Sequence, residues 1–155
     1  MQFLIIITAQ YLLYALLLIA FIWLVTFTGK KKWRIVMFAV AAGLISILLA
    51  KVGAYFISDP RPFTQGLVPL FSHAPDNGFP SDHTLLAATL AFVVAVYSWR
   101  LGTVLFVGTL AIGGARVAAN VHHIADIIGA IVIAGIATLI VWVVSKGLAK
   151  QRVPV

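Results

Sequence analysis

Apolar residues fill five long stretches of this chain, and polar residues collect between them. The stretches cover about residues 3–28, 35–57, 83–99, 102–119 and 124–145. Because a transmembrane helix needs roughly 20 mainly apolar residues, each stretch predicts one membrane-spanning helix. The third and fourth are short, and only Arg100-Leu101-Gly102 separates them. We therefore expect a single all-α integral membrane domain over residues 1–155, built as a bundle of about five transmembrane helices.

Composition agrees with a membrane protein. Hydrophobic residues make up 63% of the chain and charged residues 10%, and the mean hydropathy is +1.11. Such values exclude a soluble domain. No charged residue precedes the first stretch and a lysine cluster follows it, so we expect it to remain as a helix rather than be cleaved as a secretory signal. The absence of cysteine excludes disulfides, thiolate catalysis and cysteine-bound metals.

Charged residues sort onto two sides of the predicted bundle. Eight of the 11 basic residues follow the first, third and fifth stretches, and so share one side: Lys30, Lys31, Lys32, Arg34, Arg100, Lys146, Lys150 and Arg152. Lys51, Arg61, Arg116 and all aspartates and histidines belong to the other. Positive charge in short loops stays cytoplasmic, which predicts a site on the exoplasmic face. The net charge of +7 then reflects topology and attraction to anionic membrane lipids, not binding of nucleic acid.

Two arginines on the predicted exoplasmic side suit an anionic ligand. Arg61 lies in the loop 58–82, where Pro60 and Pro62 restrict its backbone. Arg116 follows Gly113-Gly114, small residues that allow close helix packing. A guanidinium presents a fixed fork of donors that matches phosphate. The alternative, a structural salt bridge with Asp59 or Asp126, is about equally plausible for either arginine taken alone.

The segment Phe79-Pro80-Ser81-Asp82-His83 opens the third predicted helix. Ser81 is a favourable N-cap, and Asp82 in the first turn complements the helix dipole. Free amides at such a helix start bind anions, and His83 would project beside an anion held there. A lone histidine in this position is more often a polar packing residue than a catalyst.

His122 and Asp126 are four residues apart and share one helical face. The carboxylate can accept a hydrogen bond from one imidazole nitrogen, which leaves the other as a nucleophile or base. His123 is three residues from Asp126 and is an alternative partner. A buried His–Asp pair that only links two helices is the structural alternative.

Together these residues resemble the type 2 phosphatidic acid phosphatase superfamily, which includes the vanadium haloperoxidases. Its third motif, Arg-x5-His-x3-Asp, is intact as Arg116, His122 and Asp126, and Arg61-Pro62 closes the first motif. The second motif, Pro-Ser-Gly-His, reads Pro-Ser-Asp-His, a variant similar to the bacitracin-resistance type of undecaprenyl-diphosphate phosphatase.

The resemblance implies a phosphohistidine mechanism without metal or cofactor. His122, oriented by Asp126, would attack the phosphorus, and His83 would protonate the leaving oxygen. Arg61, Arg116, the amides near Ser81 and Lys51 would hold the phosphate oxygens. Asp82 would weaken phosphate binding or tune the protonation of His83.

Two departures from the family pattern concern the first motif and the number of spans. The family places a lysine seven residues before the arginine, at the position of Ala54, whereas Lys51 precedes Arg61 by ten. Lys51 would have to extend toward the site from about one turn deeper in the helix. The family commonly has six spans, and five are expected here, without a leading helix.

The resemblance implies hydrolysis of a polyprenyl diphosphate, such as undecaprenyl diphosphate, at the outer face of a bacterial plasma membrane. Phosphatidylglycerophosphate and phosphatidic acid are alternative substrates, because the motifs recognise phosphate and not the lipid tail. A non-enzymatic lipid or anion transporter is the alternative class of protein, and a vanadate-dependent oxidase is a third hypothesis for the function. The sequence leaves the oligomeric state open.

Overall fold

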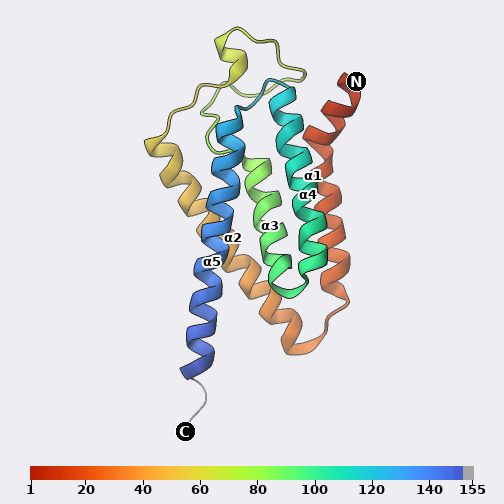
Figure 1. The fold of residues 1–155 in the computed structure, drawn as a ribbon, viewed down its shortest axis with the longest axis vertical. Helices are drawn as coiled ribbons and strands as arrows, with labels where there is room; N and C mark the ends of the chain where they lie inside the picture. Colours follow the sequence, from red (N-terminus) through yellow and green to blue (C-terminus); the bar gives the residue numbers. More distant parts are fainter. Residues whose placement is uncertain (152–155) are drawn as a thin grey trace.

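Five helices run up and down between the two ends of the molecule, the second at a slant to the others, and a long loop covers one end (Figure 1). The computed structural model describes residues 1–151, and side chains as far as residue 147. The helices are α1 (Gln2–Val25), α2 (Gly29–Phe56), α3 (Asp82–Tyr97), α4 (Trp99–Ala118) and α5 (Ile124–Gln151), and the loop holds a short 3-10 helix, η1 (Pro62–Gln65). Among the described residues, four helices are long and apolar enough to cross a membrane. The predicted all-α membrane bundle is confirmed.

Helix α3 is the shortest of the five and lies at their centre. It has 16 residues, or about 24 Å at a rise of about 1.5 Å per residue. It begins below the loop-facing ends of α4 and α5 (Figure 1) and contacts each of the other four helices. Ala87, Ala88 and Ala91 on α3 are at most 1% exposed, because small side chains let neighbouring helices approach closely.

One of the two glycines predicted to permit close packing does so. A Cβ on Gly113 would lie 2.5 Å from Cγ2 of Ile127 on α5, whereas a Cβ on Gly114 would meet nothing within 4 Å. Gly113 therefore brings the end of α4, which carries Arg116, against the start of α5, which carries Asp126.

Helix boundaries differ from the hydropathy pattern where charged residues continue a helix. Helix α2 begins at Gly29, not near residue 35, and α5 extends past residue 145 to Gln151. Lysine and arginine are good helix formers, so the backbone remains helical after the apolar stretch ends. The break between α3 and α4 lies at Ser98 alone, and Arg100-Leu101-Gly102 belongs to α4.

The loop between α2 and α3 is a structured connection, and Asn77 holds it together. The Asn77 side chain donates to the carbonyl oxygens of Ala54 at 3.1 Å and Ile57 at 2.8 Å. Its Oδ1 accepts from the backbone N–H of Asp59 at 2.9 Å and of Phe79 at 3.1 Å. These contacts join the start and the end of the loop, and so join the first two sequence motifs.

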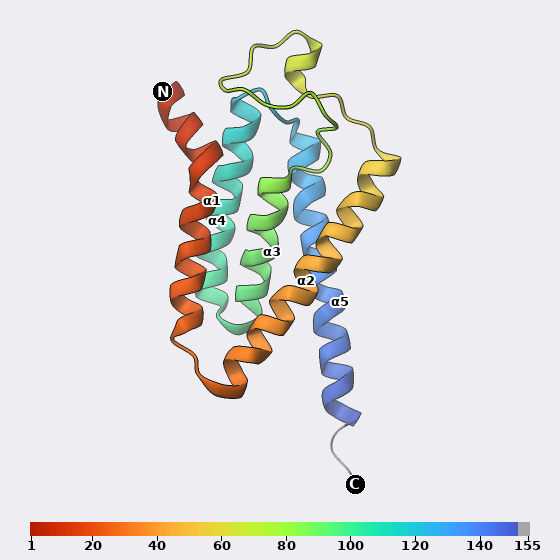
Figure 2. The same ribbon diagram turned by 180° about the vertical axis from the view of Figure 1, so that it is seen from behind.

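The two groups of charged residues lie at opposite ends of the bundle. The α1–α2 and α3–α4 connections and the end of α5 lie together, away from the long loop (Figure 2). Lys30, Lys31, Lys32, Arg34, Arg100 and Lys146 therefore occupy the end opposite Arg61 and Arg116. The side chains of Lys150 and Arg152 lie outside the described part.

Candidate active site

His122 and Asp126 form a buried pair under the long loop. His122 is 2% exposed and Asp126 0%. The His122 ring nitrogen Nδ1 lies 3.0 Å from Asp126 Oδ2, which also accepts the backbone N–H of His123 at 2.9 Å. A carboxylate is an acceptor, so Nδ1 carries the proton and Nε2 carries the lone pair. His122 precedes α5, which begins at Ile124, yet the predicted contact is made.

Arg61 faces the free nitrogen of His122. Its Nη1 lies 3.1 Å from His122 Nε2 and donates to the carbonyl of Val121 at 2.8 Å, and the residue is 3% exposed. Its Nε donates to Asp76 Oδ1 at 2.7 Å, so its carboxylate partner is Asp76, not Asp59 or Asp126. Although partial burial acts to raise the pKa of Asp76, the hydrogen bond and charge of Arg61 hold that pKa below its usual value.

Arg116 reaches the same site from α4. It is 2% exposed, and its Nη1 donates to the carbonyl of Ala9 on α1 at 3.2 Å. Its Nη2 lies 3.0 Å from His73 Nε2. Within the part of the chain that the structure describes, Arg116 has no carboxylate partner. Its charge is therefore available to an anion.

His73 is a site residue that sequence reasoning missed. It lies in the long loop, and its ring meets that of His122 edge to face, with 6.1 Å between centroids. Burial and the charge of Arg61 lower the pKa of His73, so its Nε2 can accept a hydrogen bond from Arg116. No spacing rule points to His73. Its position between the first two motifs was the only available signal.

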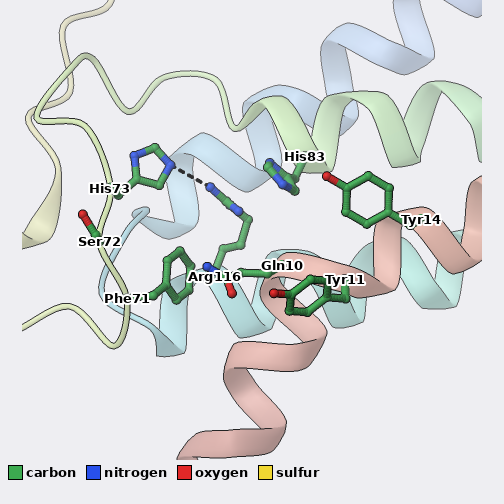
Figure 3. Close-up of a pocket in the computed structure, with 8 residues that line it drawn as sticks. All are labelled: Gln10, Tyr11, Tyr14, Phe71, Ser72, His73, His83 and Arg116. Atoms are coloured by element: carbon green, nitrogen blue, oxygen red, sulfur yellow. Dashed lines mark hydrogen bonds between the residues drawn. The ribbon is translucent and has the colours of Figure 1, made fainter.

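The start of α3 places Ser81, Asp82 and His83 as predicted, with one difference at the cap. Ser81 occupies the N-cap position and is fully buried, but its hydroxyl makes no capping hydrogen bond. It lies 3.1 Å from the Thr84 hydroxyl, and the Ser81 N–H donates to the Asp126 carbonyl at 3.3 Å. Asp82 is exposed. His83 is directed into a cavity beside Arg116 (Figure 3).

A second carboxylate, Asp59, stands next to Asp126. Asp59 Oδ1 lies 3.0 Å from His123 Nδ1, and ligand atoms of Asp59, His123 and Asp126 all lie within 4.8 Å of one another. Within the described residues, these three side chains are the group whose ligand atoms lie close enough together to hold a metal ion. Burial and the neighbouring Asp126 carboxyl group raise the pKa of Asp59, because two carboxylates close together disfavour each other's charged form. Asp126 Oδ1 is buried and has no hydrogen-bond partner within the described residues.

Glycine is needed at position 78 because the backbone there passes between the Asp126 carboxylate and the backbone carbonyl of Asp59. A Cβ on Gly78 would lie 2.9 Å from Asp126 Oδ2 and 3.1 Å from the Asp59 carbonyl oxygen. The Gly78 N–H already donates to that carbonyl at 2.8 Å. Gly78, two residues before the second motif, therefore packs directly on the carboxylate of the third.

Lys51 is not brought into this cluster. It is exposed on α2, and no ion pair within the described part of the chain includes it. Ala54 occupies the position where the family has its lysine, and its backbone carbonyl accepts a hydrogen bond from Asn77. Phosphate contact by Lys51 stays a prediction.

The surroundings of His122 favour its neutral form. Burial lowers its pKa, and the charges of Arg116 and Arg61 act in the same direction, although the hydrogen bond to Asp126 opposes them. A neutral imidazole with Nδ1–H held by a carboxylate and Nε2 3.1 Å from the Arg61 guanidinium is arranged to attack an electron-poor atom of a bound anion.

Comparison with known proteins gives consistent results. A family model described as the PAP2 superfamily matches residues 32–149. The chain is 28% identical over 141 residues to the bacitracin transport permease protein BcrC of Bacillus licheniformis, covering 89% of this chain and 69% of that protein. It is 32% identical over 122 residues to undecaprenyl-diphosphatase BcrC of Bacillus subtilis (strain 168), covering 78% of this chain and 62% of the relative.

A solved structure shares the fold. The crystal structure of Aquifex aeolicus LpxE superposes with a TM-score of 0.67 at 26% identity, over 89% of this chain and 80% of that one. Residues 32–149, the region that the family model matches, contain all three predicted motifs.

Proposed function

This chain belongs to the PAP2 superfamily, and on that premise we propose that it removes the terminal phosphate from a polyprenyl diphosphate lipid, with undecaprenyl diphosphate as the leading substrate. The observation that carries the proposal is the buried His122–Asp126 pair, whose free nitrogen lies 3.1 Å from Arg61. The name of the Bacillus subtilis relative supports the diphosphate substrate.

The reaction proceeds in two steps through these residues. Nε2 of His122 attacks the terminal phosphorus, a nitrogen–phosphorus bond forms, and the bond from phosphorus to the bridging oxygen breaks. His83 gives a proton to that oxygen, which leaves as the lipid monophosphate. His83 then takes a proton from water, the water oxygen attacks phosphorus, and inorganic phosphate leaves as His122 is restored.

Arg61 and Arg116 hold the phosphate oxygens during both steps. Phosphoryl transfer places negative charge on the three equatorial oxygens, so fixed cations beside the nucleophile stabilise the transition state. Both side chains are held by backbone carbonyls, those of Val121 and Ala9. Their positions are therefore set before the substrate binds.

The test is phosphate release by purified wild type and His122→Ala from undecaprenyl diphosphate, phosphatidylglycerophosphate and phosphatidic acid. We expect wild type to release phosphate fastest from undecaprenyl diphosphate. We expect His122→Ala to release none from the same substrate. When the terminal phosphate of the substrate carries a radioactive label, the protein should become labelled. This label should be lost in acid and kept in base, as is typical of phosphohistidine. Equal release by His122→Ala would overturn the nucleophile, and a preference for either glycerophospholipid would overturn the substrate.

We also propose that the site faces outward from a bacterial plasma membrane. The basic end of the bundle supports this orientation, since positive charge in short loops is retained in the cytoplasm. The chain has no cysteine, so single-cysteine variants are specific probes. An impermeant maleimide should label Val68→Cys in the loop of intact cells and leave Arg100→Cys unlabelled until lysis. The reverse pattern would overturn the orientation.

A further inference from the structure

A cavity of about 310 Å³ opens between α1, the long loop and the start of α3 (Figure 3). That volume is at the lower end of the range of about 300–1,000 Å³ typical of small-ligand sites. His83 and Arg116 line it, together with residues that the proposed mechanism does not use. Three of these lie on α1: Gln10, Tyr11 and Tyr14.

Gln10 and Tyr14 present polar groups to this cavity. They are four residues apart on α1, so their side chains share one face. The hydrogen bond from Arg116 to the carbonyl of Ala9 fixes the register of that face against α4. Figure 3 shows the Tyr14 hydroxyl directed toward His83, with Gln10 beside Arg116.

These polar groups lack protein partners within the cavity. Among the residues that line it, the one hydrogen bond between side chains joins His73 to Arg116. Tyr14 is 63% exposed and Gln10 is half-buried, so both polar groups can reach a molecule that enters the cavity. A tyrosine alone would be an ordinary anchor at a membrane interface, but a glutamine beside an arginine and a histidine points to an anionic ligand.

The position of the cavity relative to the two histidines tells which part of a substrate it holds. His83 lines the cavity and His122 does not. In a displacement at phosphorus, the attacking and leaving atoms lie roughly in line on opposite sides. If His122 attacks and His83 protonates the leaving oxygen, the space beyond His83 receives the leaving group. In a lipid diphosphate that group begins with a second phosphate.

We propose that this cavity is a subsite for the lipid-linked phosphate of a diphosphate substrate, with Gln10 and Tyr14 as the residues that distinguish diphosphates from phosphate monoesters. The inference rests on the proposed function, because the side of the phosphorus on which the leaving group lies follows from His122 as nucleophile and His83 as acid. The Gln10 amide and the Tyr14 hydroxyl donate hydrogen bonds to oxygens of this phosphate, and Arg116 supplies charge to both phosphates.

The experiment compares two soluble substrates with the same tail, farnesyl diphosphate and farnesyl monophosphate. Gln10→Leu and Tyr14→Phe each remove a donor and keep the approximate shape. We expect kcat/KM for the diphosphate to fall roughly tenfold in each variant, the usual effect of losing one hydrogen bond to a charged group, and kcat/KM for the monophosphate to change less than twofold. Tyr55→Phe, at a tyrosine that is 84% exposed on α2, is the matched control and should alter neither.

Equal losses on both substrates, or no loss on the diphosphate, would overturn the subsite. Binding of methylenediphosphonate and inorganic phosphate, measured by calorimetry, provides a second readout that does not depend on hydrolysis. We expect wild type to bind the diphosphonate more tightly, and Tyr14→Phe to lose that preference. A wild type that binds it more tightly but leaves farnesyl diphosphate intact would overturn the proposed function and keep the subsite. A wild type without the preference would overturn the subsite alone.

Discussion

Replacing Asp126 by Asn tests whether the carboxylate contributes charge or only geometry. The asparagine carbonyl can accept the same two hydrogen bonds that Asp126 Oδ2 accepts now, from His122 Nδ1 at 3.0 Å and from the His123 backbone at 2.9 Å. Its amide group would take the place of Oδ1 and can donate to Asp59. The fold should therefore tolerate the change, while one negative charge beside the nucleophile is lost.

The magnitude follows from the distance between the two groups. When Nε2 bonds to phosphorus, the His122 ring becomes cationic, and Asp126 lies 3.0 Å from its Nδ1. Coulomb's law with an effective dielectric constant of about 20 gives roughly 5.5 kcal/mol for unit charges at that separation. This is an upper limit, equivalent to about 10⁴ in rate. Because the amide dipole keeps part of the interaction, we expect kcat to fall by roughly 10² to 10⁴.

The assay is phosphate release under saturating lipid diphosphate, with the thermal unfolding midpoint measured on the same samples. Asp126→Asn should keep a midpoint close to that of wild type, whereas Asp126→Ala, which leaves two donors without an acceptor, should lower it. Thr103→Ala at the opposite end of the bundle is the control and should match wild type. A kcat for Asp126→Asn within tenfold of wild type would refute a catalytic role for the charge.

Three further predictions concern the same site. Gly78→Ala should lower kcat at least tenfold, because its Cβ would lie 2.9 Å from Asp126 Oδ2 and must displace it; wild-type kcat with normal folding would contradict this packing. Treatment with a chelator should leave activity unchanged, since His122 and the arginines supply the chemistry, and a loss restored by a divalent cation would instead assign a metal to the group of Asp59, His123 and Asp126. Because burial lowers the pKa of His122 and attack needs the neutral ring, kcat/KM should fall only as the pH drops below about 6.5; an acid limb above that value would contradict the assignment.

The helices and their order could be predicted because the information is local. A run of apolar residues long enough to cross a membrane specifies a helix wherever it lies, and the spacing from His122 to Asp126 brings the two side chains together without reference to the rest of the chain. The same holds for the sorting of lysines and arginines into alternate connections. Boundaries were wrong where hydropathy stopped but helical hydrogen bonding did not, as at Gly29 and beyond residue 145.

The partners of the arginines could not be predicted, because the contacts depend on how the long loop returns over the helix ends. Arg61 pairs with Asp76, and Arg116 with His73 and the Ala9 carbonyl. On charge alone, Asp59 and Asp126 were equally acceptable partners for the two arginines. Only the folded loop, held closed by Asn77, decides which group lies within hydrogen-bonding distance.

The sequence by itself determined an all-α membrane bundle with charged ends and a histidine–aspartate pair, and the family comparison agrees with the motifs it carries. The tertiary structure alone decided that Nε2 of His122 faces Arg61, that His73 and Asp59 join the cluster, and that Gln10 and Tyr14 on α1 line a cavity with His83. The physical reason is range. Hydropathy and helical spacing act over a few turns of one segment, whereas the site is assembled from contacts between residues as far apart as Ala9 and Arg116.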